Sequence, residues 1–231
     1  MLRIDKLSCG YGQVQALTDV SIEAMPGQIT CVMGRNGVGK TTLLKTIMGV
    51  LPAWRGEIHA SDIDLTKLPT SVRARRGVAL VPQGRHIFPK LTVMENLRIG
   101  LEARTDRQRQ VPDSIFEMFP VLKQMSHRMG GDLSGGQQQQ LAIGRALVGE
   151  PKVLLLDEPT EGIQPNIIQL IGRVLRRLAE EMGMTIVLVE QFLGFVREIG
   201  HRYYILNRGA VVAHGVPAEL EEETIARHLS V

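Results

Sequence analysis

Cysteine is scarce in this chain of 231 residues and occurs only as Cys9 and Cys31. Two cysteines are too few for a disulfide framework, and Cys31 lies in an expected buried strand, which is consistent with a reducing compartment. No apolar run approaches membrane-spanning length; residues 184–189 form one of the longest and are expected to be a strand. The chain is charged from Arg3 onward without a long apolar region, so we expect no signal peptide. Membrane association would therefore go through a partner.

Charge of one sign is also not in large excess. The net charge is +3 and the pI is 9.0, and a composition of 44% hydrophobic and 22% charged residues is ordinary for a globular protein. Arg73, Arg75 and Arg76 form a local basic cluster. We interpret it as a solvated face and not as a nucleic-acid site, so no nucleic-acid partner is expected. The sequence contains no internal repeat, low-complexity tract or added regulatory domain.

A glycine-rich segment follows the apolar run at residues 29–33 and precedes an expected helix at residues 42–48 that ends at Gly49. It fits the pattern G-x-x-x-x-G-K-[ST]. Backbone N–H groups of such a loop and the helix N-terminus converge on one anion site. We expect Lys40 to reach the β- and γ-phosphates of a nucleotide, and the Thr41 hydroxyl to bind Mg²⁺. The candidate nucleotide-binding residues are Gly34, Arg35, Asn36, Gly37, Val38, Gly39, Lys40, Thr41 and Thr42.

Two carboxylates follow a second apolar run, LLLDEP, in which residues 153–156 form an expected strand covered on both faces. Asp157 and Glu158 leave its C-terminal end, where open α/β sheets place ligands. We predict Asp157 as a ligand of Mg²⁺. Glu158 is the candidate catalytic base, which accepts a proton from, or orients, the water that attacks the γ-phosphate.

The segment LSGGQ contains a second helix N-terminus. Ser134 and Gln137 form a capping box, and Leu141, Ile143 and Leu147 continue as the buried side of a helix, with Ala146. Two adjacent glycines, Gly135 and Gly136, leave room for an anion against that terminus. From the box alone, a capped helix with a flexible lead-in is an equally good interpretation.

The pattern predicts an α/β P-loop core with an antiparallel β edge, interrupted once by a helical subdomain. We expect one domain over residues 1–231, with a core at 1–83 and 147–231 and the subdomain at about 84–146. Within the subdomain, a capping box starts at Thr92 and a helix is expected at residues 113–125. After it, a helix begins at Pro165 and keeps an apolar stripe until Gly183, and residues 203–207 and 210–213 form a hairpin.

With these motifs, the chain resembles the ATP-binding subunits of ABC transporters over essentially its whole length. The resemblance implies that ATP and Mg²⁺ bind, and that Ser134, Gly135, Gly136 and Gln137 close over the nucleotide of a second ATP-binding subunit, identical or related. It also implies that Tyr11 stacks on adenine. Gln83, between core and insertion, is implied to act in catalysis and in the Mg²⁺ shell. Residues 88–91 are where family members meet the transmembrane permease subunits, although from the sequence alone a packed loop is an equally good interpretation. The resemblance implies a location on the cytoplasmic face of the cell membrane and an indirect link to an external solute-binding protein.

Two residues depart from the usual family pattern. Gln191 stands where most members carry a histidine that touches the γ-phosphate, and Gln164 replaces an aspartate. Both departures match the branch of importers for branched-chain amino acids, amides and urea. Gln83 and residues 137–140 are most similar to the E-type ATP-binding subunit of urea importers, since the amino-acid subunits usually read PEGR and SGGEQQ. We therefore expect urea as the solute, with branched-chain amino acids or short-chain amides as the alternative.

Two other function classes share these motifs. DNA-repair and chromosome-associated ATPases carry the same signature, but they separate the core halves by long coiled coils, and the insertion here is far too short. A nucleotide-binding scaffold without turnover is the second alternative. Glu158 argues against it, whereas Gln191 keeps it open.

Overall fold

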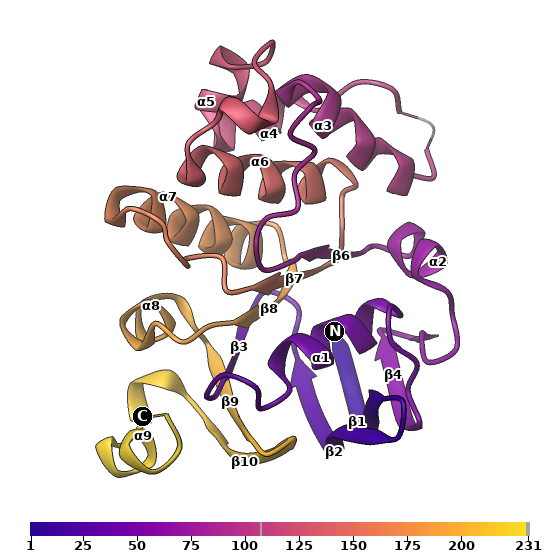
Figure 1. The fold of residues 1–231 in the computed structure, drawn as a ribbon, viewed down its shortest axis with the longest axis vertical. Coiled ribbons are helices and arrows are strands. Elements are labelled where there is room, and N and C mark those ends of the chain that lie inside the picture. The colour runs from indigo at the N-terminus through magenta and orange to yellow at the C-terminus, as the bar shows by residue number, and fades with distance from the viewer. Residues whose placement is uncertain (107, 230–231) are drawn as a thin grey trace.

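A six-stranded sheet forms the centre of the computed structural model, which describes residues 1–106 and 108–229 (Figure 1). Its strands are β3 (Ile29–Met33), β6 (Val78–Val81), β7 (Val153–Asp157), β8 (Thr185–Val189), β9 (Arg202–Asn207) and β10 (Ala210–Gly215). Their order is β10-β9-β3-β8-β7-β6. All neighbours pair in parallel except β9 and β10, which form the expected antiparallel hairpin. The parallel arrangement brings the carboxyl ends of β3, β7 and β8 to one edge.

A second, antiparallel sheet packs beside the first. It consists of β1 (Leu2–Tyr11), β2 (Val14–Ala24), β4 (Arg55–Ala60) and β5 (Ile63–Asp64), in the order β2-β1-β4-β5. Apolar side chains of β1 and β2 such as Leu7 and Leu17 are fully buried, whereas the residues between them are mostly exposed. This is the alternation expected of a sheet with one solvated face, and it confirms the predicted antiparallel edge.

Helices cover both faces of the central sheet. Helix α1 (Lys40–Met48) lies between the two sheets, where Leu44 packs with Leu155 of β7. On the other face, Leu154 and Leu156 of the same strand pack with the helices that follow the signature segment. Because side chains alternate along a strand, a continuous apolar run contributes side chains to the hydrophobic cores on both faces of the sheet. Helix α1 begins two residues earlier than expected and ends, as expected, at Gly49 in the left-handed conformation.

The inserted helices gather at one end of the molecule (Figure 1). They are α3 (Val93–Ile99), η1 (Gly100–Ala103), α4 (Asp113–Met118), α5 (Pro120–Gln124), η2 (Gly130–Asp132) and α6 (Gly135–Val148). The capping boxes predicted at Thr92 and Ser134 are both present. The prediction of one helix over residues 113–125 is wrong: α4 stops before Phe119 because Pro120 disfavours helical geometry in the preceding residue. The subdomain limits of residues 84–146 stay a prediction. Helix α6 runs to Val148 and so continues past the expected C-terminal limit.

The remaining helices connect the strands or follow the last one. They are α2 (Thr70–Arg75), α7 (Pro165–Arg176), η3 (Arg177–Glu181), α8 (Leu193–Ile199), η4 (Pro217–Glu219) and α9 (Glu222–His228). The apolar stripe expected after Pro165 buries Ile171, Leu175 and Leu178 against the central sheet, and η3 completes it as a π-helical turn. Within the described residues, no helix is long and apolar enough to cross a membrane.

The basic cluster is only partly a solvated face. Arg75 and Arg76 are exposed, but Arg73 is buried, contrary to expectation. Its guanidinium donates to the carbonyl oxygens of Thr46 and Ile47 at 2.8 and 2.7 Å, and to those of Leu68 and Thr66 at 2.8 and 3.0 Å. Arg73 thus satisfies carbonyls at the C-terminus of α1, a contact between distant residues that composition alone does not reveal.

Candidate functional site

The glycine-rich loop connects β3 to α1 and is shaped by close backbone contacts. Gly34 has a φ of 145° and Gly39 a φ of 108°. A Cβ at Gly34 would lie 2.4 Å from the carbonyl oxygen of Leu206, and one at Gly39 would lie 2.5 Å from Leu17 Cδ2. No other residue type fits at these two positions. Helix α1 has no side-chain cap and no acidic residue in its first turn, so its N-terminus is suited to an anion.

Lys40 links this loop to the carboxylates at the end of β7. Its side chain is buried, and Nζ donates to the carbonyl oxygens of Gly34 and Arg35 at 2.8 and 3.0 Å. Nζ also lies 3.5 Å from Glu158 Oε1. The ammonium group is therefore held at the point where the loop and the end of β7 meet.

Asp157 ends β7 and is buried, and its Oδ1 has no hydrogen-bond donor among residues 1–106 and 108–229. Burial raises the pKa of Asp157, and the negative charge of Glu158 raises it further, whereas a hydrogen bond with Thr41 and the charges of Lys40 and Lys45 oppose the shift. A buried carboxylate oxygen without a donor, next to a hydroxyl, fits a hard cation such as Mg²⁺. The described residues hold no group of three or more His, Cys, Asp or Glu side chains suited to a metal, so the Thr41 hydroxyl, water and nucleotide oxygens would complete the ligand shell.

Glu158 lies at the centre of a network built from distant segments. Its φ is 47°, a left-handed conformation that is uncommon outside glycine, and its backbone N–H donates to Val189 O at 2.9 Å. Gln83 Nε2 donates to Glu158 Oε2 at 3.2 Å, and Gln191 Nε2 donates to Glu158 Oε1 at 2.5 Å. Gln191 Nε2 also contacts Asn36 Oδ1 at 2.7 Å. The structure thus brings together the predicted residues Asn36, Lys40, Gln83, Glu158 and Gln191.

Tyr11 lies at the edge of the same region. It ends β1, its side chain is exposed, and its hydroxyl is 3.5 Å from Thr42 Oγ1 in the first turn of α1. The ring is therefore open to solvent near the glycine-rich loop, as an adenine platform requires.

The signature residues form a separate part of the surface. Ser134 N donates to Gln137 Oε1 at 2.9 Å, and Gln137 N donates to Ser134 Oγ at 3.4 Å. A hollow of about 480 Å³ is lined by all four candidate signature residues, together with Gly162 and Gln164. None of residues 34–42 lines it. Within one chain, the signature and the glycine-rich loop therefore do not share a hollow.

Three further residues at the site were not predicted. Glu190 follows β8 directly and is buried with its carboxylate hydrogen-bonded. Arg85 places its guanidinium 3.0 Å from a Cβ built on Gly135 of the signature. Arg145 of α6 donates to His86 O at 2.8 Å and has its guanidinium carbon 5.3 Å from the centre of the Phe88 ring. Only Glu190 had a sequence signal, an acidic residue next to Gln191 at a strand end.

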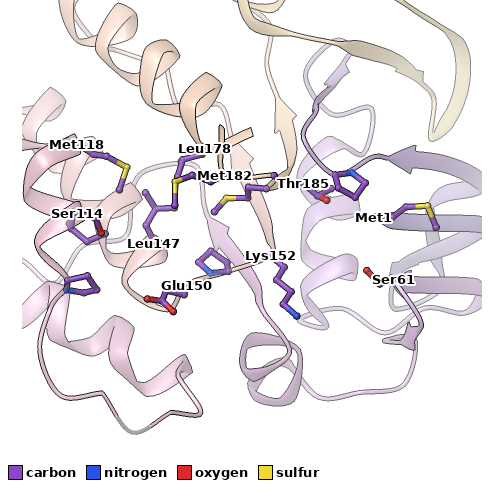
Figure 2. A pocket seen from close by; sticks show the side chains of 16 residues that line it. Met1, Ser61, Ser114, Met118, Leu147, Glu150, Lys152, Leu178, Met182 and Thr185 are labelled. Atoms are coloured by element: carbon purple, nitrogen blue, oxygen red, sulfur yellow. The ribbon is translucent and has the colours of Figure 1, made fainter. Parts of the chain in front are cut away.

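A different hollow, of about 450 Å³, lies at the opposite edge of the central sheet (Figure 2). Lys152 directly precedes β7 and Thr185 begins β8, and Met118, Leu178 and Met182 give the hollow an apolar wall. No candidate site residue lines it. Because open α/β sheets bind ligands at the carboxyl ends of their strands, the edge with Glu158 is the candidate active site.

Comparisons with known proteins agree with this geometry. The family described as ABC transporter matches residues 17–161. The chain is 45% identical to the high-affinity branched-chain amino acid transport ATP-binding protein BraG of Pseudomonas aeruginosa, over 95% of this chain and 94% of that protein. It is 39% identical to the probable branched-chain amino acid transport ATP-binding protein LivF of Archaeoglobus fulgidus, over 96% and 94%.

A more distant relative and a solved structure extend the comparison. The lipopolysaccharide export system ATP-binding protein LptB of Escherichia coli K12 is 33% identical over 98% of this chain and 95% of its own. The dimeric post-hydrolysis structure of the ATP-binding cassette MJ0796, bound to ADP and Pi, superposes with a TM-score of 0.83 and 27% identity, and covers 94% of this chain and 99% of that one. With the P-loop and the carboxylates at the carboxyl edge of the sheet, these likenesses establish that the chain belongs to the ABC transporter family of ATP-binding subunits, which hydrolyse ATP.

Proposed function

We propose that this ATPase binds Mg-ATP at the glycine-rich loop and uses Glu158 to activate the attacking water. The observation that carries this proposal is the position of Glu158, whose carboxylate accepts from Gln83 and Gln191 and lies 3.5 Å from Lys40 Nζ. A base must lie within hydrogen-bond reach of the proton that it takes, beside the phosphate site. Glu158 is placed there by a strained turn at the carboxyl end of β7.

The reaction then follows from these side chains. A water molecule gives a proton to the Glu158 carboxylate while its oxygen bonds to the γ-phosphorus, and the bond between that phosphorus and the β–γ bridging oxygen breaks to release ADP. Lys40 exchanges its carbonyl contacts for phosphate oxygens and stabilises their charge. Asp157 and Thr41 would hold Mg²⁺, with Gln83 near its shell; when bound, this ion neutralises phosphate charge. Gln191 orients Glu158 without itself becoming charged.

A second ATP-binding subunit is the partner that completes the site. The signature hollow and the glycine-rich loop lie apart within one chain, which supports an arrangement in which Ser134, Gly135, Gly136 and Gln137 contact the nucleotide of the neighbouring subunit. The similarity to the MJ0796 dimer supports the same arrangement. Arg85, beside Gly135, would add positive charge on the signature side of that nucleotide.

Transmembrane permease subunits are the second kind of partner. Phe88 is exposed and its ring lies against the Arg145 guanidinium of α6, so a protein bound at residues 88–91 would contact a segment linked to the signature helix. This arrangement supports coupling between permease and ATP site, and a place for the chain on the cytoplasmic face of the membrane.

The solute is best assigned to branched-chain amino acids. BraG and LivF, at 45% and 39% identity, are both named for amino-acid transport, and neither supports the expectation of urea. The expectation of urea depends on Gln83 and the glutamines at residues 137–140, which belong to the ATP-binding domain and not to a solute-binding site. The 33% identity to LptB, an export protein, shows that the ATPase domain is shared across different cargoes.

Uptake in cells that lack the gene tests this proposal. We expect loss of leucine uptake and unchanged urea and acetamide uptake, with restoration by the wild-type chain and not by Glu158→Gln. Loss of urea uptake with normal leucine uptake would overturn the amino-acid assignment. Full restoration by Glu158→Gln would instead overturn the role of Glu158.

A further inference from the structure

Glu190 is a buried carboxylate whose oxygens are all used between two loops of the site. Oε1 accepts from the backbone N–H of Thr160 at 3.1 Å and from its hydroxyl at 2.6 Å. Oε2 accepts from the backbone N–H groups of Gln191 and Phe192 at 2.9 and 3.2 Å. Glu190 is only 2% exposed. A buried charge without a cation is costly unless it is hydrogen-bonded, and no ion pair of the described residues includes Glu190, so these four bonds hold it in place.

The two loops are those of Glu158 and Gln191. Thr160 follows Glu158 by two residues, and Gln191 follows Glu190 directly. The Glu158 N–H also donates to Val189 O, so the segments are joined on both sides of the Glu158 side chain. The strained φ of 47° at Glu158 persists only while its surroundings fix the turn.

The backbone of Glu190 joins the end of β8 to β3. Its backbone N–H donates to Val32 O of β3 at 3.2 Å. Cys31 is the titratable neighbour on that strand, and burial raises the pKa of its thiol, with the charge of Glu190 as a second cause. Burial is thus the main reason that this thiol stays protonated, and the Glu190 oxygens are directed to the two loops.

We propose that Glu190 is a positioning residue for hydrolysis: its carboxylate ties the loop of Glu158 to the loop of Gln191 and thereby sets the contact between the two side chains. The inference rests on the proposed role of Glu158 as the base. Glu190 does not touch the nucleotide site directly, so its loss disturbs the alignment of the base more than the binding of ATP.

Substitution of Thr160 tests this link between the two loops with the smallest change in side-chain shape. Thr160→Val keeps the shape of the side chain and removes the hydroxyl bond, whereas Thr160→Ser keeps the hydroxyl and serves as the matched control. We expect Thr160→Val to lower kcat by about tenfold with the KM for Mg-ATP within about twofold, and Thr160→Ser to stay within about twofold in both constants. Equal activity of the two variants, or a loss confined to KM, would overturn the proposal.

A double-mutant cycle separates positioning from general destabilisation. Glu190→Gln leaves an amide N–H₂ facing backbone N–H donors and should lower kcat by about tenfold or more. In the Glu158→Gln background, where the base is absent, the same substitution should lower the remaining rate by less than about twofold. Full additivity would show that Glu190 acts independently of Glu158 and would overturn the inference. A Glu158→Gln variant with normal turnover would instead reject the base itself, and the Thr160 pair decides the outcome if Glu190→Gln does not fold.

Discussion

Gln191 Nε2 donates to Glu158 Oε1 at 2.5 Å and to Asn36 Oδ1 at 2.7 Å, so one amide joins the glycine-rich loop to the candidate base. An amide makes both contacts without changing charge between about pH 6 and 8, whereas a histidine at this position would titrate there. We therefore expect the contact that orients Glu158 to be independent of pH over this range.

Replacement of Gln191 by histidine should introduce this missing titration. We expect Gln191→His to fold and to preserve or raise ATPase activity near pH 7, with activity that changes more between about pH 6 and 8 than in the wild type. ATPase rates across that range provide the measurement. Gln108→His, on an exposed loop, is the matched control. Loss of activity at every pH with normal ATP binding would show that the amide contact itself is required.

Removal of the charge of Asp157 should stabilise the protein without nucleotide. The folded-state pKa of Asp157 is raised, so the folded protein binds this proton more tightly than the unfolded chain, and the free energy of unfolding falls as pH rises through that pKa. Asp157→Asn should therefore increase the free energy of unfolding at pH 7, and the gain should vanish below the pKa of an aspartate in the unfolded chain, about 4.

The same variant should lose its response to Mg²⁺. We expect ATP with Mg²⁺ to raise the Tm of the wild type more than ATP with EDTA does, and this difference to disappear in Asp157→Asn. Thermal unfolding of both proteins, without nucleotide at about pH 4 and pH 7 and then with ATP plus either Mg²⁺ or EDTA, measures both effects. A variant that is less stable at pH 7 and still responds to Mg²⁺ would contradict the assignment of Asp157.

Loss of Lys40 should weaken the binding of ATP itself. Its ammonium group is the buried cation of the glycine-rich loop, and a charge-assisted contact to phosphate contributes roughly 1.5–3 kcal/mol, so Lys40→Met should raise the Kd for ATP by about tenfold or more. Calorimetric titration gives the constant, with Lys67→Met, at an exposed position, as the control. An unchanged Kd in Lys40→Met would reject the phosphate contact.

A bulky side chain at the signature should block pairing and spare ATP binding. Ser134→Arg places an arginine at the N-terminus of α6, so association of two ATP-binding subunits in Mg-ATP should be lost while the Kd for ATP of the single chain stays within about twofold. Ser134→Ala, which removes only the cap at a cost of about 1 kcal/mol, separates bulk from capping. Light scattering of the hydrolysis-slow Glu158→Gln background, with and without Mg-ATP, gives the result. Normal pairing of Ser134→Arg would contradict the shared site.

Local signals predicted those parts of the structure that depend on neighbours in sequence. The capping boxes at Thr92 and Ser134 and the glycine-rich loop are visible because their residues lie within a few positions of one another. The break at Phe119 was missed because the apolar pattern continues through it, although Pro120 marks it. Burial of Arg73 depends on carbonyls up to 27 residues away, and no pattern in the sequence indicates it.

In the candidate site, too, residues marked by their neighbours in sequence could be predicted, and contacts between distant segments could not. Asp157 and Glu158 could be predicted because they end an apolar run, and their position at the sheet edge follows from parallel pairing. The contact between Thr160 and Glu190 spans 30 positions of sequence and exists only because β7 and β8 are neighbours in the sheet. The contacts of Gln83 and Gln191 with Glu158 likewise exist only because the fold brings three distant segments together.

The rate of ATP hydrolysis by Glu158→Gln is the sharpest test of Glu158 as the catalytic base, because the substitution removes the base and keeps the size of the side chain. We predict that this variant binds Mg-ATP with a Kd within about twofold of the wild type and hydrolyses it at least about a hundredfold more slowly, while Glu117→Gln, on the exposed side of α4, retains wild-type turnover. Near-wild-type hydrolysis by Glu158→Gln would contradict the account.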